Sequence, residues 1–329
     1  MTRHPKRAAA ILALWGLLAF PGSSRAQSAL PARGEGTVGV IYSHLFVQDH
    51  IFAAGDHRDI GHIRSHVLLA DLEYGLSDRW AVRAHLPYVT ARYSGDFPHR
   101  HGHGPQPPGF VMLDDQTYHS ALQDFGAEVR YGAMEFPVAI APFVGVNIPT
   151  HDYEVFAHSA IGLNMVELQV GVYAGIARGP FSFEGRIGYG LYEKVLGIRR
   201  NRTALDAEIG WFATSSVRVF AFQASQISHG GFDIVFADLP VIQFEEWWPH
   251  HDQLGRANHL NVGLGTSVQV SQSMTLHGSV YTTAAGVNSH AARYGLSMGA
   301  SWGFGGPRPV HASASAARHG AAPPPPHAF

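Results

Sequence analysis

The sequence predicts an all-β protein, a single transmembrane antiparallel β-barrel of about twelve strands with short periplasmic turns and long extracellular loops. Three observations support this prediction. An export signal stands at the N-terminus, side chains alternate between apolar and polar with a period of two after residue 36, and short connections between the alternating segments take turns with long ones.

The export signal is an apolar run from Ala8 to Phe20 that follows three basic residues and precedes several small ones. A basic start, a short apolar core and small residues at the end are typical of a secretory signal peptide, here residues 1–26, cleaved before Gln27. The alternative is an N-terminal anchor helix, but the run is too short to span a bilayer. We therefore expect export to the outer membrane of a Gram-negative-type bacterium.

The composition excludes several classes of function. Without residues 1–26 the chain has 19 Lys and Arg against 25 Asp and Glu, so it lacks the basic excess of a nucleic-acid-binding protein. It has no cysteine, which excludes disulfides and thiolate chemistry. Charged residues make up only 15% of the 329 residues and glycine is abundant, a profile that favours strands over helices.

The alternation is clearest in residues 292–304. Apolar side chains at Tyr294, Leu296, Met298, Ala300, Trp302 and Phe304 alternate with small ones at Gly295, Ser297, Gly299, Ser301 and Gly303. Successive strand residues point to opposite faces, so each strand has one apolar face, and no helices are predicted to cover it. The membrane supplies the missing apolar partner. We predict a barrel domain at 27–306 and a disordered tail rich in Pro, Ala and His at 307–329.

The predicted strands are 36–46, 63–75, 80–93, 120–132, 136–147, 159–175, 181–193, 202–213, 216–227, 258–270, 274–284 and 292–304. Short connections are expected near 75–79, 132–135, 176–180, 213–215 and 271–273. Long ones are expected at 47–62, 94–119, 148–158, 194–201, 228–257 and 285–291. This regular alternation matches the short turns and long loops of outer-membrane barrels and is not expected of a soluble β-sandwich.

The same alternation sorts the charged residues onto the inner wall. The candidates for the lumen or for solute selectivity are Asp71, Glu73, Arg83, His85, Asp124, Glu128 and Arg130. Later strands direct Glu167, Gln169, Glu184, Arg186, Asp206, Glu208, Gln269 and His277 inward. A charge facing lipid at mid-depth costs about 2–4 kcal/mol, which explains the pattern. Two interpretations remain: ion pairs that brace and partly fill a narrow barrel, or a polar constriction that selects solutes.

The loop 228–257 is the best candidate for a lid or constriction, because it is unusually apolar, and Phe244, Trp247 and Trp248 are its lid candidates. The alternative is a short amphipathic segment that lies on the rim of the barrel.

The chain has 22 histidines, and His99, His101 and His103 form a dense run in the loop 94–119. Neutral imidazole binds zinc, copper and nickel, so these three are candidate metal ligands. Their spacing matches no closed structural metal site, and a solvated, pH-responsive loop is the alternative interpretation. No cofactor is predicted. No nucleophile elbow, HExxH motif or phosphate-binding loop is present, so we expect no enzyme activity.

Three segments resemble a known family. Residues 71–88 resemble the "YGLTDR…P" hairpin of a family of outer-membrane transporters named for the MetA-pathway of phenol degradation. Residues 124–131 resemble its "GD…KY" strand, and residues 141–150 its "G…LPTG" strand end, with His151 where glycine is usual. The resemblance implies a barrel fold and uptake of aromatic or hydrocarbon compounds, and it transfers no binding residue.

The sequence thus predicts a channel for passive uptake of small molecules, aromatic or hydrophobic compounds among them. The alternatives are metal handling through the His-rich loops and a non-conducting surface barrel. Expected partners are outer-membrane lipid, the solute, and the barrel-assembly machinery through the final strand ending at Phe304. The sequence predicts no oligomeric state.

Overall fold

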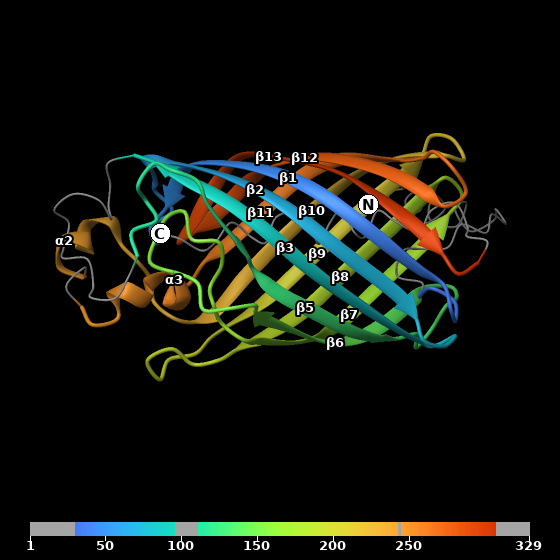
Figure 1. The fold of residues 1–329 in the computed structure, drawn as a ribbon, viewed down its shortest axis with the longest axis horizontal. Coiled ribbons are helices and arrows are strands. Elements are labelled where there is room, and N and C mark those ends of the chain that lie inside the picture. Colours follow the sequence, from blue (N-terminus) through green and yellow to red (C-terminus); the bar gives the residue numbers. More distant parts are fainter. Residues whose placement is uncertain (1–29, 96–110, 243–244, 307–329) are drawn as a thin grey trace, which may run out of the picture.

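A computed structural model describes residues 30–95, 111–242 and 245–306, and they form a closed, tilted antiparallel β-barrel (Figure 1). The barrel closes because the first strand, β1 (Gly36–Ile51), pairs with the last, β13 (Ser289–Phe304). Their register runs from Gly36 opposite Phe304 to Ile51 opposite Ser289. The predicted signal peptide and C-terminal tail lie outside the described residues.

The remaining strands pair with the strands that precede and follow them in the sequence, except that β4 and β5 do not pair with each other. These strands are β2 (His57–Gly75), β3 (Trp80–Ser94), β4 (His119–Leu122), β5 (Asp124–Tyr131), β6 (Ala139–Pro149), β7 (Glu167–Arg178), β8 (Phe181–Tyr192), β9 (Arg200–Phe212), β10 (Val217–Gly230), β11 (Asn258–Gln269) and β12 (Met274–Val287). Both β4 and β5 pair with β3, and Gln123 separates them, so they act as one interrupted strand. The barrel therefore has twelve strands, as predicted.

Helical structure within the described residues is confined to one connection. It contains the short 3-10 turns Phe236–Asp238 and Trp248–His250 and the helices α2 (Leu239–Ile242) and α3 (His251–Leu254). None of the helices in the described part of the chain is long and apolar enough to cross a bilayer.

The two faces of the wall differ as the alternation predicts. On β2, Leu68 and Leu72 are exposed on the outer surface, whereas Leu69 and Asp71 between them are buried in the interior. The outer face is apolar along most of the barrel, which fits contact with hydrocarbon rather than water.

All five predicted short turns are present, at one end of the barrel: 76–79, 132–138, 179–180, 213–216 and 270–273. We call this the turn end and the opposite one the loop end. Two predicted long loops are wrong. β1 and β2 extend until only residues 52–56 connect them, and β12 meets β13 at Asn288 alone, with a left-handed φ of 47°. Polar residues there suggested loops, but a strand that continues beyond the hydrocarbon can expose polar side chains on both faces.

The predicted strand 159–175 is wrong in its first half. β7 begins at Glu167, and the connection from β6 to β7 is therefore residues 150–166, here named the inward loop. Its apolar stretch is buried, with Ala160 and Met165 almost inaccessible. The prediction failed because an apolar run can be satisfied by the barrel interior as well as by a strand facing lipid.

Candidate solute pathway

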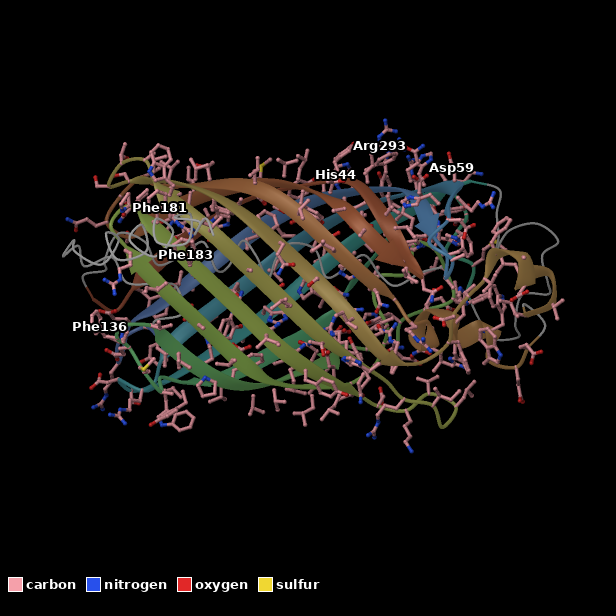
Figure 2. All side chains as sticks on the ribbon, turned by 180° about the vertical axis from the view of Figure 1, so that it is seen from behind. His44, Asp59, Phe136, Phe181, Phe183 and Arg293 are labelled. Atoms are coloured by element: carbon pink, nitrogen blue, oxygen red, sulfur yellow. The ribbon has the colours of Figure 1, made fainter. Side chains whose placement is uncertain are left out.

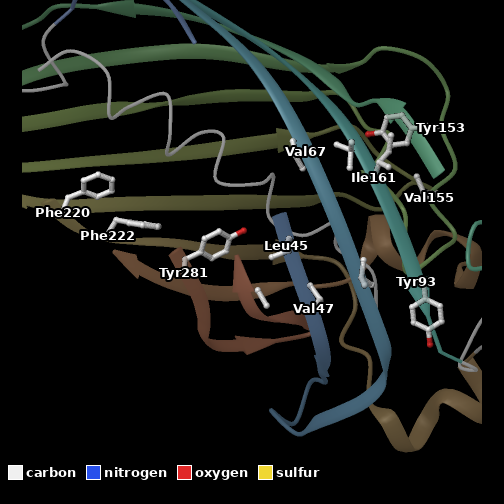
Figure 3. Packing of buried hydrophobic residues seen from close by; sticks show 13 residues of the cluster. Leu45, Val47, Val67, Tyr93, Tyr153, Val155, Ile161, Phe220, Phe222 and Tyr281 are labelled. Atoms are coloured by element: carbon white, nitrogen blue, oxygen red, sulfur yellow. The ribbon is translucent and has the colours of Figure 1, made fainter. Parts of the chain in front are cut away.

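The inward loop enters the barrel and packs against its inner wall near the loop end. Tyr153, Val155 and Ile161 contribute to one hydrophobic cluster with residues from distant strands (Figure 3). The strand members of this inner apolar cluster include Leu45, Val47, Ile63, Val67, Val89, Tyr93, Phe220, Phe222, Tyr281 and Ala292. Burial of this apolar area stabilises the loop inside the lumen, at about 25 cal/mol per Å² removed from water.

Tyr153 ties the inward loop to the charged wall. Its hydroxyl donates a hydrogen bond of 2.5 Å to Oδ1 of Asp124 and accepts one of 2.9 Å from the backbone N–H of Asn164. Burial and the neighbouring Asp124 carboxylate raise the pKa of the Tyr153 phenol. The phenol therefore stays protonated and able to donate across the physiological pH range.

A second attachment holds the far side of the inward loop. The buried carboxylate of Asp114 accepts hydrogen bonds from the backbone N–H groups of His158 (2.8 Å) and Ser159 (3.0 Å). The Ser159 hydroxyl donates a further bond to it, at 2.8 Å. Gln253 of α3 donates to the Leu163 carbonyl at 2.8 Å, which links the loop to the segment above it. These bonds satisfy backbone groups that the loop removes from water.

The segment above is the cap segment, residues 231–257, which contains the predicted lid residues. Trp248 is buried in a cluster with Phe52, Phe156 and Ile234, and Trp247 packs against this cluster. His251 stacks on Trp248 with ring centroids 4.2 Å apart. Phe244 lies outside the described residues. Figure 1 places α2 and α3 at the loop end of the barrel, where a lid would lie.

Below the inward loop is a partly open space, here named the central cavity, with a volume of about 240 Å³. Gly162, Leu163 and Met165 of the inward loop form part of its boundary. Four of the seven lumen candidates line it, Arg83, His85, Asp124 and Glu128, together with Glu167, Gln169, Arg186 and Asp206 of the later strands. An apolar cavity of about 150 Å³ holds a benzene molecule, so the central cavity has room for a small solute.

The other three predicted lumen residues face inward and form ion pairs beside the cavity. Asp71 binds Arg83, with 2.7 Å between Oδ1 and Nη2. Arg130 lies between two carboxylates, 2.8 Å from Glu73 and 3.2 Å from Glu128. The side chains of Arg83 and Arg130 are almost inaccessible to solvent. In this region the interior is braced by ion pairs, as the first of the two interpretations predicts.

Arg202 is the main lumen residue missing from the sequence-based candidates. Its guanidinium binds Glu167 through two hydrogen bonds, of 2.6 and 2.7 Å, and Gln226 at 3.0 Å. Glu167 also accepts bonds from Asn147 and Gln169. Arg202 lies four residues before Asp206 on the same strand, so alternation directs both side chains to the same face. The predicted strand began at Arg202, and this first residue was not assigned to a face. Tyr192 and His259 line the same cavity.

Aromatic rings cover some of these charged groups. The guanidinium carbon of Arg186 lies 4.6 Å from the Phe143 ring centroid and 5.7 Å from that of Tyr173. Arg186 also donates to Gln169 at 2.8 Å and lies 3.7 Å from Asp206. Stacking leaves the edges of the guanidinium free to bond. Phe143 and Tyr173 support Arg186 from behind, while Tyr192, Phe222 and Tyr281 supply the aromatic surface of the cavity wall.

Several histidines gather at the loop end. His50, His158 and His290 are buried together, with the His50 ring centroid 4.7 Å from that of His158 and in contact with His290. In the part of the chain that the structure describes, no cluster of three or more His, Asp or Glu is arranged to hold a metal ion. The predicted ligands His99, His101 and His103 lie outside the described residues.

The fold defines the class of protein: a twelve-stranded membrane β-barrel with inward-folded segments at one end. Among solved structures, the chain is similar to the COG4313 outer membrane channel from Pseudomonas putida F1, at 16% identity and a TM-score of 0.63. That alignment covers 87% of this chain and 100% of the other.

A weaker similarity is to the translocator domain of the autotransporter NalP from Neisseria meningitidis. It has 11% identity and a TM-score of 0.46, covering 91% of this chain and 95% of that one. No protein-family model and no curated protein match the chain. The similarity to the Pseudomonas channel supports the fold, and the resemblance to the MetA-pathway family stays a prediction.

Proposed function

We propose that this protein is an outer-membrane channel that admits small molecules passively through the central cavity. One observation carries the proposal: a cavity of about 240 Å³ lies in the middle of the barrel, lined by charged groups from several strands and bounded above by the inward loop. The Pseudomonas protein of the same fold is an outer membrane channel, which supports this reading of the cavity.

The lining favours solutes that combine an apolar ring with a polar group. Phe222 and Tyr281 of the inner apolar cluster line the cavity together with Tyr192 and with the charged groups Arg186 and Arg202. Such a lining suits aromatic acids and alcohols better than sugars, because the aromatic side chains remove the ring from water while the charged groups meet its polar end. The resemblance to a family named for phenol degradation points in the same direction.

The first experiment measures conductance of the purified, refolded protein in planar lipid bilayers. We expect discrete single-channel steps, and larger steps when residues 154–163 of the inward loop are replaced by a short Gly/Ser linker. A matched control replaces the exposed Leu196, in the connection between β8 and β9, with glycine, and its step size should equal that of the wild type. A wild type and a loop variant that both give no steps would contradict the channel proposal.

The second experiment tests the solute class. Liposomes containing the protein should take up an aromatic carboxylate such as benzoate faster than a sugar of similar size. Equal rates for the two would contradict the proposed preference, and the conductance experiment would still test the channel. The predicted role of the final strand, ending at Phe304, in recognition by the assembly machinery stays a separate prediction.

A further inference from the structure

The outer face of β2 changes chemistry abruptly near the loop end. Leu72, Ala70 and Leu68 are apolar, and the next outward residues toward the loop end are His66, Arg64 and His62. Arg64 points outward because Ile63 and Ser65 on either side are both buried at 2% exposure in the interior. On β3 the same change separates Tyr88 from Arg92. The apolar band of the outer wall therefore ends at a cationic row.

Two arginines of this row face each other directly. In the pairing of β2 with β3, Arg64 is the cross-strand partner of Arg92, and on its other side Arg64 is opposite Phe46 of β1. Like charges directly opposite each other destabilise a sheet. A third arginine, Arg293, is exposed on β13 (Figure 2), next to Tyr294, which is the cross-strand partner of Phe46. We name Arg64, Arg92 and Arg293 the outer arginine patch.

Within the described residues, none of the three arginines has a carboxylate in ion-pair contact. Arg64 lies over the Phe46 ring at 5.5 Å and Arg92 over the Tyr118 ring at 4.8 Å, while Arg293 donates to the Gln48 amide oxygen at 2.6 Å. Arg92 Nε is buried and has no hydrogen-bond partner among the described groups. Stacking on a ring uses the face of a guanidinium and leaves its N–H edge for an anion.

The acidic residues next to the patch bond to other groups, and Asp115, beside Tyr118, bonds Thr117 and His119. Asp56 binds Arg58 at 3.0 Å, Asp49 lies 3.8 Å from His57, and Asp59 accepts a bond from Gln48. The patch therefore keeps a local positive charge next to the apolar outer wall, where Leu68, Leu296 and Met298 are exposed. Phosphate, like carboxylate, is an anion that the edge of a guanidinium group binds through paired hydrogen bonds.

The geometry points to a lipid-binding site: we propose that the outer arginine patch binds the phosphate of a phosphorylated outer-leaflet lipid, lipopolysaccharide, whose acyl chains lie along Leu68, Leu296 and Met298. This inference rests on the outer-membrane placement in the proposed function, with the loop end outward, and not on channel activity. The apolar outer wall directly adjoins the arginine row. This favours a lipid over free phosphate, because the wall can contact the acyl chains while the arginines bind the phosphate of the same molecule.

The opposite side of the barrel provides a matched surface at the same end. There four outward residues are neutral: the Tyr189 and His229 ring centroids lie 5.7 Å apart, the His229 ring bonds the Thr203 hydroxyl at 2.8 Å, and Asn201 donates to the Tyr189 hydroxyl. The exposed Lys194 and Arg199 lie beyond this group, in the connection between β8 and β9. The pair of arginines that face each other, Arg64 and Arg92, belongs to the sector formed by β13, β1, β2 and β3.

The experiment measures lipid binding to the purified, refolded full chain by native mass spectrometry and by titration in detergent. The probes are diphosphoryl lipid A, its dephosphorylated form, and inorganic phosphate as competitor. The test variant is Arg64→Gln/Arg92→Gln, with Asn201→Ala and Arg79→Gln, in a turn at the turn end, as controls. Loss of charge-assisted hydrogen bonds should weaken lipid A binding by about tenfold or more in the test variant only.

Several results would overturn the proposal. These are equal binding of phosphorylated and dephosphorylated lipid A, unchanged affinity in the test variant, or equal weakening in the controls. Displacement of lipid A by millimolar inorganic phosphate would show that the patch binds a free anion rather than a lipid. Circular dichroism and heat-modified gel mobility show whether the test variant has folded. If the test variant does not fold, the single variants Arg64→Lys and Arg92→Lys replace it. Each keeps the positive charge and should therefore keep partial binding of lipid A. Wild-type conductance in bilayers free of lipopolysaccharide tests the channel separately.

Discussion

Arginine occupies both walls of this barrel, and the two walls treat it differently. On the inner wall Arg83 and Arg130 are buried and Arg202 is half-buried beside the cavity, and each contacts at least one carboxylate within 3.2 Å. On the outer wall near the loop end, Arg64 and Arg92 face each other and contact aromatic rings. The inner charges complete a network, whereas the outer ones leave hydrogen-bonding edges available.

The difference follows from the surroundings of each wall. A charge taken from water into a closed interior is costly unless a partner neutralises it. A charge at the headgroup level keeps contact with water and phosphate, so it needs no partner within the protein. An arginine that contacts a carboxylate of the protein is therefore interpreted as structural, and an arginine without such a contact as a candidate to bind an external anion. The following predictions test that comparison.

The largest effect is expected from breaking an inner pair. Glu167→Ala removes the buried, bidentate partner of Arg202 and should lower the free energy of unfolding by about 3–5 kcal/mol. Guanidinium titrations of the protein in lipid vesicles measure this change. The double variant Glu167→Leu/Arg202→Met should recover most of the loss. A double variant as unstable as the single one would show that the pair is not the cause.

A charge placed on the outer wall at mid-depth should cost somewhat less. Leu264 of β11 is 60% exposed on the outer face, and Leu264→Arg should destabilise the barrel by about 2–4 kcal/mol. Near the loop end Ile227→Arg should cost only about 0–1 kcal/mol. The same vesicle titrations compare the two. Equal costs would contradict the assignment of the loop end to the membrane interface.

The inward loop provides a third test, on the inner wall. Tyr153→Phe removes the hydrogen bond to Asp124 and should destabilise the protein by about 1.5–3 kcal/mol, the usual range for a bond to a charged group. Because the loop is then less firmly held, single-channel records should show more frequent changes of current. Tyr294→Phe, on the outer wall, is the control and should change neither stability nor current. Steady currents in the Tyr153 variant would mean that other contacts fix the loop.

The smallest change in the free energy of unfolding is expected in the outer arginine patch, and there the substitution should stabilise the protein rather than destabilise it. Arg64→Glu converts a repulsive cross-strand pair with Arg92 into an attractive one, so it should stabilise the barrel by about 0.2–1 kcal/mol in phosphatidylcholine vesicles. The same substitution should reduce binding of lipid A. A destabilised variant in these vesicles would contradict the arrangement described for the two arginines.

The fold was largely predictable because lipid imposes a simple rule on each strand. Alternation correctly directed Asp71, Arg83 and Arg130 to the interior, since a charge facing hydrocarbon is costly wherever it occurs. Arg202 was missed only because the predicted strand began at that residue. The errors at 47–62 and 285–291 have another cause: beyond the membrane the rule no longer applies, and a polar segment there can be strand or loop.

By itself, the sequence determined the barrel, its twelve strands, the turn end and the inward direction of the charged wall, because each of these depends on neighbours within one strand. Only the tertiary structure decided what fills the lumen. That residues 150–166 fold inward, that Tyr153 bonds Asp124 and that Arg64 lies opposite Arg92 all depend on register between strands. Register and long-range packing bring together residues far apart in the chain, so a pattern within one strand cannot predict them.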